Sequence, residues 1–511
     1  MSKLCGAQLL SAAHIRSGPV CFMMITSKPE ATLQKYICSS VILCRFLSYS
    51  TVFGRSHITF MHALHESLID AGHEVHVLSP IAIEAGEDES KDTLQYPGLI
   101  EQLSEEKYDA AFSEPICFCG FGIFEKLGIK NIATTLSTSG FGGFFRYTGA
   151  AAVPSYVPGV LSPFTDRMTF FQRVVNTLQS AMPYLVTPML RDPYTVMFQQ
   201  RFGEHFPTTE EILDKVSLHF LNAEPLTEFP QMTTHKIVEI GGISVARLHN
   251  QLNEYWSNVM SMRKKTVIIS FGTIANSYHM PDAYKQTLLQ TIRKFPNVTF
   301  IWKYEKPEHR ISDGIDNLIE TTWMPQNDIL SGSLFTSSSS SDHLLTSGSA
   351  IEATKAGVPL VVIPVLGDQE RNAQVIKRIK TGVVLAKADL AGGDALERAL
   401  REVLDNDTYT RNAKTIGKMI SPRSLRVKLS CDTWNSWRNT DRSDYSTTTA
   451  RSSTSYILPV VAFLCCVKAL FVRCFRLRKV KVEMRRLIHR TPEKHKLREE
   501  LNESVALTMP F

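Results

Sequence analysis

The sequence lacks features on which several protein classes depend. Its ten cysteines are scattered over 511 residues and show no spacing typical of a metal site, so no bound metal is expected. No basic stripe with aromatic neighbours occurs upstream of the C-terminal end, and nucleic acid is not expected as a partner. A clean signal peptide is also missing, because the apolar stretch 36–47 is short and contains Arg45. The chain does have a hydrophobic content of 43%, enough for two or three folded domains.

Positive charge is concentrated near the C-terminus. The formal net charge is +6, and arginine and lysine residues crowd together within 473–486. Directly before them, residues 456–472 (YILPVVAFLCCVKALFV) are nearly all apolar, although Pro459 and Lys468 interrupt a run that is only just long enough to span a bilayer. Since basic residues favour the cytosolic side, this order predicts a single type I membrane helix with the preceding domains in the lumen. A buried helix is the alternative, but little apolar sequence follows that could cover it.

Strand and helix patterns alternate along most of the chain, as in a parallel, doubly wound α/β sheet. Apolar residues recur at helical spacing from His57 to His73, between runs that predict strands, and a second helix is expected at 282–294. We therefore expect two α/β domains. The expected organisation is an N-terminal segment 1–47 with a degraded or internal signal, a first domain 48–245, a polar linker 246–263, a second domain 264–421, a polar segment 422–455, the membrane helix 456–472 and a basic cytosolic tail 473–511.

Several polar residues follow predicted strands, at the edge where open α/β sheets bind ligands. In the first half they are His57, in the stretch GRSH, and Glu114, at the end of YDAAFSEP. In the second half the turn Ser270 to Thr273 follows an apolar run, and the pair Asp368 and Gln369 follows the run PLVVIP. Taken singly, each of these residues is more often a capping residue or part of a solvated turn than part of a site.

Seven stretches, in this order, carry a resemblance to a known family. They are GRSHITFM, PSYVPG, NAEPLTEFP, IGGISV, SFGT, WMPQNDIL and GVPLVVIPVLGDQERNA. Over about residues 48–420 the sequence resembles the UDP-glycosyltransferases of the UDP-glucuronosyltransferase type. The resemblance implies two facing Rossmann-like domains (the GT-B fold), a C-terminal membrane anchor, a short cytosolic tail and transfer of a sugar from a UDP-sugar co-substrate without a prosthetic group or metal.

The resemblance places the UDP-sugar in the second domain. Asp368 and Gln369 would hold neighbouring hydroxyls of the sugar, since a carboxylate accepts hydrogen bonds and an amide both accepts and donates. Trp323 would stack on the uracil ring, while Gln326 and Glu352 would bind the ribose. The residues expected to bind the co-substrate are Ser270, Gly272, Thr273, Trp323, Gln326, His343, Ser349, Glu352, Asp368 and Gln369.

The expected diphosphate site departs from the family pattern. A helix that starts near residues 347–349 would offer backbone amides and its positive end to the phosphates. Members of the family carry Thr-His-Gly-Gly here, whereas this chain reads TSSSSSDHLLTSGSAIEAT, with His343 one place from the expected histidine position at Leu344. The missing glycines put donor affinity in question, although Ser347 to Ser349 can still form a small nest of amides.

Catalysis in the family is an inverting displacement, and the resemblance gives His57 the role of general base. A histidine suits this role because its ordinary pKa lies close to neutral pH, and a carboxylate behind it fixes the tautomer. Glu114 stands where many members carry aspartate, and Asp109 is an alternative partner for the ring. Arg371 and Arg146 are candidates for a cation beside a sugar carboxylate, as glucuronate would require.

The first domain is expected to choose the acceptor. The stretch 140–171 is rich in glycine, proline and aromatic residues, which suits irregular loops around a pocket for small lipophilic acceptors. The segment between the runs VLSPI and YDAAFSEP is much shorter than in the family, which suggests an altered exon boundary. An active transferase of the endoplasmic reticulum membrane is the leading interpretation. The alternatives are an impaired relative that acts as a binding partner of active transferases, in a homo- or hetero-oligomer, and a soluble sugar-nucleotide epimerase.

Overall fold

We describe the protein from a computed structural model. The structure describes residues 11–15, 21–27, 44–50, 54–81, 98–140, 142–150, 152–244, 252–272, 276–332, 341–345, 347–365 and 367–420. All of these belong to one compact unit, which ends at Asp441. The predicted membrane helix 456–472 and the tail after it lie outside the described residues. Within the described ranges, no helix combines the length and apolar character that crossing a bilayer requires.

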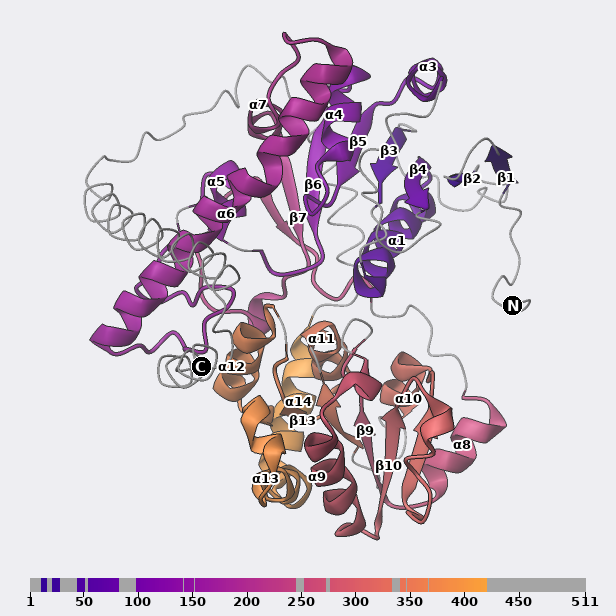
Figure 1. The fold of residues 1–511 in the computed structure, drawn as a ribbon, viewed down its shortest axis with the longest axis vertical. Coiled ribbons are helices and arrows are strands. Elements are labelled where there is room, and N and C mark those ends of the chain that lie inside the picture. Colours follow the sequence, from indigo (N-terminus) through magenta and orange to yellow (C-terminus); the bar gives the residue numbers. More distant parts are fainter. Residues whose placement is uncertain are drawn as a thin grey trace, which may run out of the picture. The chain divides into compact units, whose positions relative to one another are not determined.

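The first sheet has the strand order β1-β2-β4-β3-β5-β6-β7-β8. Strands β4, β3, β5, β6, β7 and β8 are parallel neighbours, whereas β1 and β2 form an antiparallel edge that pairs through β2 with β4. Strand β3 begins before the predicted boundary at residue 48, because Phe46 and Leu47 are already buried in the core. The strands are β1 Ser11–Ile15, β2 Cys21–Ser27, β3 Arg45–Tyr49, β4 Glu74–Ile81, β5 Ala110–Ser113, β6 Ile132–Leu136, β7 Leu218–Leu221 and β8 Ile237–Glu239 (Figure 1).

Helices connect these strands, as the alternating pattern predicts. In α1 the apolar side chains of Phe60, Leu64 and Leu68 recur at helical spacing and are buried against the sheet, and Gly72 follows with a φ of 91°. Part of the stretch 140–171, expected as irregular loops, is helical in α5. The helices are α1 Arg55–Asp70, α3 Leu99–Glu105, α4 Cys119–Lys126, α5 Gly142–Thr148, α6 Phe170–Phe202 and α7 Thr209–Asp214.

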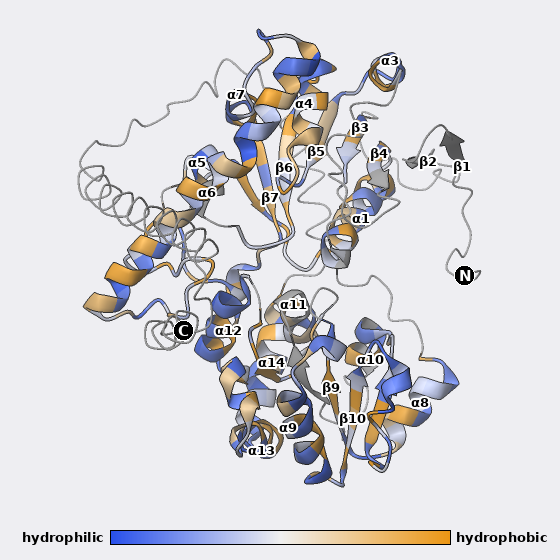
Figure 2. Ribbon diagram, in the orientation of Figure 1, coloured by the Kyte–Doolittle hydropathy of each residue, from blue (hydrophilic) through white to orange (hydrophobic). Residues whose placement is uncertain are grey.

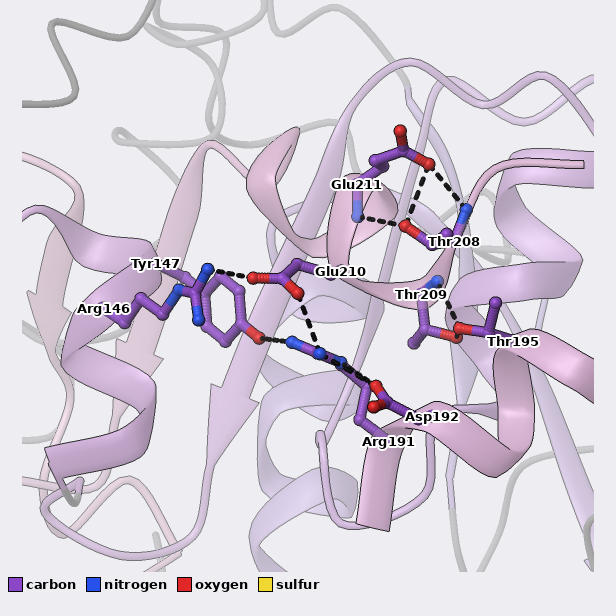
Figure 3. Close-up of polar contacts among 9 residues, drawn as sticks. All are labelled: Arg146, Tyr147, Arg191, Asp192, Thr195, Thr208, Thr209, Glu210 and Glu211. Carbon is purple, nitrogen blue, oxygen red and sulfur yellow. Dashed lines mark hydrogen bonds and ion pairs between the residues drawn. The ribbon is translucent and has the colours of Figure 1, made fainter. Parts of the chain in front are cut away.

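A charged cluster ties α5, α6 and α7 together (Figure 3). The guanidinium of Arg191 in α6 is nearly buried, donates to the hydroxyl of Tyr147 in α5 at 2.9 Å and lies 2.8 Å from a carboxylate oxygen of Glu210 in α7. Arg146 pairs with the other oxygen of Glu210. Since three helices share one carboxylate, α6 is held in place although it contains three prolines.

The second sheet is parallel throughout, with the order β11-β10-β9-β12-β13-β14. Its strands are β9 Lys265–Ile269, β10 Val298–Lys303, β11 Leu318–Thr321, β12 Ser341–Leu345, β13 Leu360–Val362 and β14 Gly382–Val384. Its helices are α8 Glu254–Ser261, α9 Asp282–Arg293, α10 Gln326–Gly332, α11 Ser347–Ala356, α12 Gln369–Ile379, α13 Ala395–Asp405 and α14 Asp407–Met419.

Apolar residues of the second sheet form its core, and β9 and β10 are largely orange in Figure 2 while α12 is largely blue. Trp302 and Phe300 of β10 are fully buried, with side chains of α9 and α13 packed against the same cluster. Helix α8 lies within the range 246–263, which was expected to lack a core pattern. Its Trp256 and Val259 are buried beside Ile268, so this part of the predicted linker packs on the second sheet.

Candidate functional site

Three neighbouring strands of the first sheet end at the same edge. Because β3, β5 and β6 run parallel, with Tyr49 opposite Ser113 and Ser113 opposite Thr134, the residues that follow them come together. Helix α1, after β3, carries His57. The residue that follows β5 is Glu114, and Ser137 follows β6 directly. The strand order therefore places an imidazole, a carboxylate and a hydroxyl within contact distance.

The three side chains form a closed hydrogen-bonded cluster, which we call the His57 cluster. Nδ1 of His57 lies 2.8 Å from Oε2 of Glu114 and 2.7 Å from Oγ of Ser137. The backbone N–H of Ser137 donates to Oε1 of Glu114 at 2.7 Å. Glu114 is 1% exposed and His57 is 13% exposed, so the carboxylate lies behind the ring and the ring lies nearer to solvent. This arrangement fixes the ring and the tautomer that carries its proton on Nδ1.

Asp109, the alternative partner of His57, lies elsewhere. It precedes β5 whereas Glu114 follows it, so the strand separates the two carboxylates. Oδ2 of Asp109 accepts from the backbone N–H of Arg45 at 2.8 Å. The alternative that pairs Asp109 with His57 is therefore wrong. Ser137 was not among the residues predicted from the sequence. Only its position directly after an apolar strand, at the edge where ligands bind, could have indicated it.

In the second half, Gln326 and Glu352 are in contact. Nε2 of Gln326, at the start of α10, donates to Oε2 of Glu352 in α11 at 2.9 Å. Burial raises the pKa of the Glu352 carboxyl to about 7, and the hydrogen bond from Gln326 opposes that rise. Near neutral pH this carboxyl therefore exists in both protonation states. Trp323, three residues before Gln326, has 53% of its surface exposed.

The pair Asp368 and Gln369 begins α12 immediately after the turn at Gly367. Gly367 has a φ of 62°, a conformation that favours glycine. Oε1 of Gln369 accepts from the backbone N–H of Val365 at 2.7 Å, and Oδ2 of Asp368 accepts from Nδ2 of Asn372 at 3.0 Å. Both side chains are partly exposed, and each accepts a hydrogen bond from the protein.

The remaining predicted donor residues follow β9, lie within β12 or begin α11, and some lie outside the described residues. Ser270 follows β9, is buried and accepts from the backbone N–H of Gly272 at 3.5 Å. His343 lies in β12 opposite Ile268 and Leu360, and Ser349 lies in the first turn of α11. Their side chains, and all of Thr273, lie outside what the structure describes.

The two arginines proposed to meet a sugar carboxylate are already paired with glutamates. Arg371 is 3% exposed, and its Nη1 lies 2.5 Å from Oε2 of Glu228. Arg146 pairs with Glu210 in the cluster of Figure 3. Each guanidinium is therefore partly neutralised by a carboxylate, and Arg371 is also buried, whereas half of the Arg146 side chain is exposed.

A pocket lies in the stretch that the sequence assigned to acceptor binding. It is a small pocket of about 40 Å³ that is open to solvent on one side. Gly140, three residues beyond Ser137, belongs to its wall, which connects the pocket to the His57 cluster along the chain. Its lining is mostly apolar and consists of Gly140, Phe145, Ala152, Val153, Pro154, Val157, Pro158, Gly159, Val160, Ser180, Pro183, Gln231, Met232 and Arg371.

The chain is similar to one family of enzymes over most of its described length. A family model described as "UDP-glucoronosyl and UDP-glucosyl transferase" matches residues 83–426. The Caenorhabditis elegans protein ugt-48 is 30% identical over 355 residues, which are 65% of this chain and 64% of ugt-48. UDP-glucuronosyltransferase 1A8 of Rattus norvegicus is 26% identical over 348 residues, which are 64% of this chain and 60% of the relative. The chain thus spans less than two thirds of the length of these curated relatives.

Solved structures agree on the fold. The glycosyltransferase of kitacinnamycin superimposes with a TM-score of 0.55 at 12% identity, covering 78% of this chain and 99% of that one. The spinosyn forosaminyltransferase SpnP superimposes with a TM-score of 0.53 at 18% identity, covering 76% and 99%. At this level of identity the likeness is one of architecture, and it identifies the two α/β sheets as the GT-B arrangement.

Proposed function

The chain belongs to the family of UDP-glucuronosyl and UDP-glucosyl transferases, and on this premise we propose that it transfers a hexosyl group from a UDP-sugar to a small lipophilic acceptor. The His57 cluster carries the proposal. A buried carboxylate, a hydroxyl and an imidazole meet at the carboxyl edge of a parallel sheet, which is where such folds bind ligands. This cluster has the composition of a general base with its orienting group.

In the proposed reaction, Nε2 of His57 removes the proton from an acceptor hydroxyl. The oxygen attacks the anomeric carbon, and UDP leaves from the opposite face with the bonding electron pair, so the configuration inverts. Glu114 stabilises the imidazolium that forms, because its Oε2 lies 2.8 Å from Nδ1. Ser137 holds both partners, since its N–H binds Glu114 and its hydroxyl contacts the ring. Positioned proton transfer of this kind contributes about 10²–10⁴-fold to a rate.

We assign UDP-sugar binding to the second half of the chain. Trp323 supplies an exposed indole for stacking on uracil, and the Gln326–Glu352 pair supplies oxygen atoms for the ribose hydroxyls. Asp368 and Gln369, fixed at the start of α12, bind the hydroxyls of the sugar. The start of α11, where Ser349 lies, faces the diphosphate with its amides.

The acceptor occupies the mostly apolar pocket, whose wall comes from residues between Gly140 and Val160, from Ser180 and Pro183 of α6, and from Gln231, Met232 and Arg371. Its mostly apolar wall favours a phenol, an alcohol or a carboxylic acid on a hydrophobic body. Anchoring to the endoplasmic reticulum membrane through residues 456–472, and association with related transferases, belong to the same proposal and follow from the sequence pattern.

The test is turnover in microsomes that contain the full chain. UDP release is measured with a panel of phenols, with UDP-glucuronate and UDP-glucose in separate reactions. We expect release that depends on the acceptor and that falls about 10²–10⁴-fold in His57→Ala. Equal rates in wild type and His57→Ala would remove His57 as the base.

A second function is favoured by one observation. The chain reads TSSSSSDHLL where relatives carry Thr-His-Gly-Gly, and serines cannot replace glycines that let the backbone approach a phosphate. On this reading the protein is an impaired relative that binds active transferases. Titration of the protein with UDP separates the two functions: saturable binding that Trp323→Ala abolishes supports the transferase, and absence of any binding supports the impaired relative.

A further inference from the structure

The side chain of Arg371 connects the two halves of the compact unit that contains all described residues. Arg371 lies in the first turn of α12, two residues after Gln369. Its Nη1 donates to Oε2 of Glu228 at 2.5 Å and to Oγ of Ser139 at 3.0 Å. Both bonds reach residues of the first half, at sequence separations of 143 and 232 residues. All three side chains are buried, with exposures of 3% for Arg371, 8% for Glu228 and 7% for Ser139.

A second arginine on the same face of α12 also contacts residues of the first half. Arg378 follows Arg371 by two helical turns, so both side chains project to one side. The guanidinium carbons of the two arginines lie 5.4 and 5.6 Å from the ring centre of Phe229. Arg378 also donates to the carbonyl oxygen of Glu228 at 3.0 Å and pairs with Asp166 at 3.3 Å. We call Arg371, Arg378, Glu228 and Phe229 the α12 clamp.

The α12 clamp joins two functional regions. On one side, α12 begins with Asp368 and Gln369, the residues that the proposed function assigns to the sugar. On the other side, Ser139 stands two residues after Ser137, which donates its backbone N–H to Glu114 and contacts His57 with its hydroxyl. Arg371 therefore lies on the helix that is proposed to bind the sugar. Its guanidinium bonds directly to Ser139, in the segment that contacts His57.

We propose that Arg371 is a positioning residue, which fixes the distance between the donor sugar and His57 by binding Glu228 and Ser139 at once. The inference rests on the proposed function and adds to it the element that aligns the two bound substrates. A buried ion pair costs desolvation and is weak evidence for stability, so its value here lies in geometry. Reaction rates respond steeply to such alignment, since a displacement of 1 Å can cost about 100-fold.

Two conservative variants test the proposal. Arg371→Lys keeps the charge, but the lysine side chain ends about one bond short of the position of Nη1 and has no planar group to lie over Phe229. Glu228→Gln keeps the shape and removes the charge of the partner. In both we expect kcat to fall about 100-fold while the Kd of UDP stays within about twofold of the wild-type value. The double variant should be no slower than the slower single variant, because both changes break one connection.

The control with the same substitution is Arg401→Lys, at an arginine whose side chain is about half exposed. Arg401 in α13 pairs with Glu397 and lies over the ring of Phe295 at 4.9 Å, so it makes the same kinds of contact entirely within the second half. Its kcat should equal that of the wild type. Thermal melting of every variant identifies loss of folding. A kcat of Arg371→Lys within about threefold of wild type overturns the proposal, as does a parallel loss of kcat, UDP affinity and melting temperature.

A second measurement does not need turnover. Hydrogen exchange of the peptide that contains Ser137 and Ser139 should slow when UDP-glucose binds to the wild type, because Arg371 transmits the constraint from α12. In Arg371→Lys that protection should disappear at equal UDP-glucose occupancy. Protection that persists in Arg371→Lys overturns the positioning role. If the wild type shows this protection but no transfer to any acceptor, the proposed function fails and the connection through Arg371 stands.

Discussion

The His57 cluster and the donor residues differ in how completely their own contacts hold them. In the first sheet, Glu114 is almost fully buried and uses both oxygens, one on His57 and one on Ser137. In the second sheet, the indole of Trp323 is more than half exposed, and Asp368 and Gln369 are only partly buried. The imidazole of His57 is therefore already oriented without a bound substrate, whereas the donor site presents exposed groups that a bound nucleotide would cover.

The largest effect on the reaction is expected from a substitution in the His57 cluster. In Glu114→Gln the N–H of Ser137 still requires an acceptor, so the amide oxygen takes that place and the NH₂ group faces Nδ1 of His57. Nδ1 must then accept, the proton moves to Nε2, and the ring cannot act as a base. We expect kcat to fall about 10²–10⁴-fold, measured by UDP release.

The control for Glu114→Gln is Glu114→Asp, which restores a carboxylate and the residue that the family pattern favours. It should recover most of the lost rate, while UDP affinity stays unchanged in both variants. A Glu114→Gln enzyme with wild-type kcat would show that the carboxylate does not orient the ring.

A smaller effect, on the affinity for the UDP-sugar, is expected from a substitution in the donor site. Asp368→Ala removes a carboxylate proposed to accept hydrogen bonds from the sugar, and hydrogen bonds to charged groups contribute about 1.5–3 kcal/mol, or roughly 10–150-fold in affinity. We expect the Kd of UDP-glucose to rise by that factor and the Kd of UDP alone to stay constant, both measured by calorimetry. An equal loss for UDP and UDP-glucose would mean that Asp368 shapes the start of α12 and does not bind the sugar.

Local patterns predicted part of each sheet, because the alternation of strands and helices depends on neighbours in the sequence. The apolar run before Gly367 predicts β13, and the positive φ of that glycine agrees with a turn into α12. The parallel sheet order then brings His57 and Glu114 together, as expected for residues that follow adjacent strands.

Contacts over long sequence separations were not predictable in the same way. Arg371 looked like a cation available to a sugar carboxylate, yet Glu228, 143 residues away, neutralises it. Nothing in the local sequence of either residue indicates the other. Ser137 was missed for a related reason, since a single serine after a strand has no distinctive pattern. Helix α6 continues through three prolines, where local rules predict breaks.

The smallest effect concerns the protonation state of Glu352. Burial places its pKa at about 7, above the ordinary value of 4.5, so the neutral form is favoured in the folded protein. The stability that this form contributes is present below pH 4.5 and is lost as the pH rises through 7. If ribose hydroxyls donate to the carboxylate, UDP requires the ionised form. UDP should then bind about tenfold more tightly at pH 8 than at pH 6.

Glu352→Gln separates this effect from the titration of UDP itself. The amide oxygen can still accept from Gln326, so the contact between α10 and α11 is kept while the titrating group is removed. Calorimetry at both pH values should show a strong pH dependence of UDP affinity in the wild type and a weak one in Glu352→Gln. Thermal melting should show that the wild type loses stability relative to Glu352→Gln between pH 5 and 8. Equal pH dependence of UDP affinity in the two proteins would place the ribose away from Glu352, and the donor site would then depend on Trp323 and the start of α11 to bind the nucleotide.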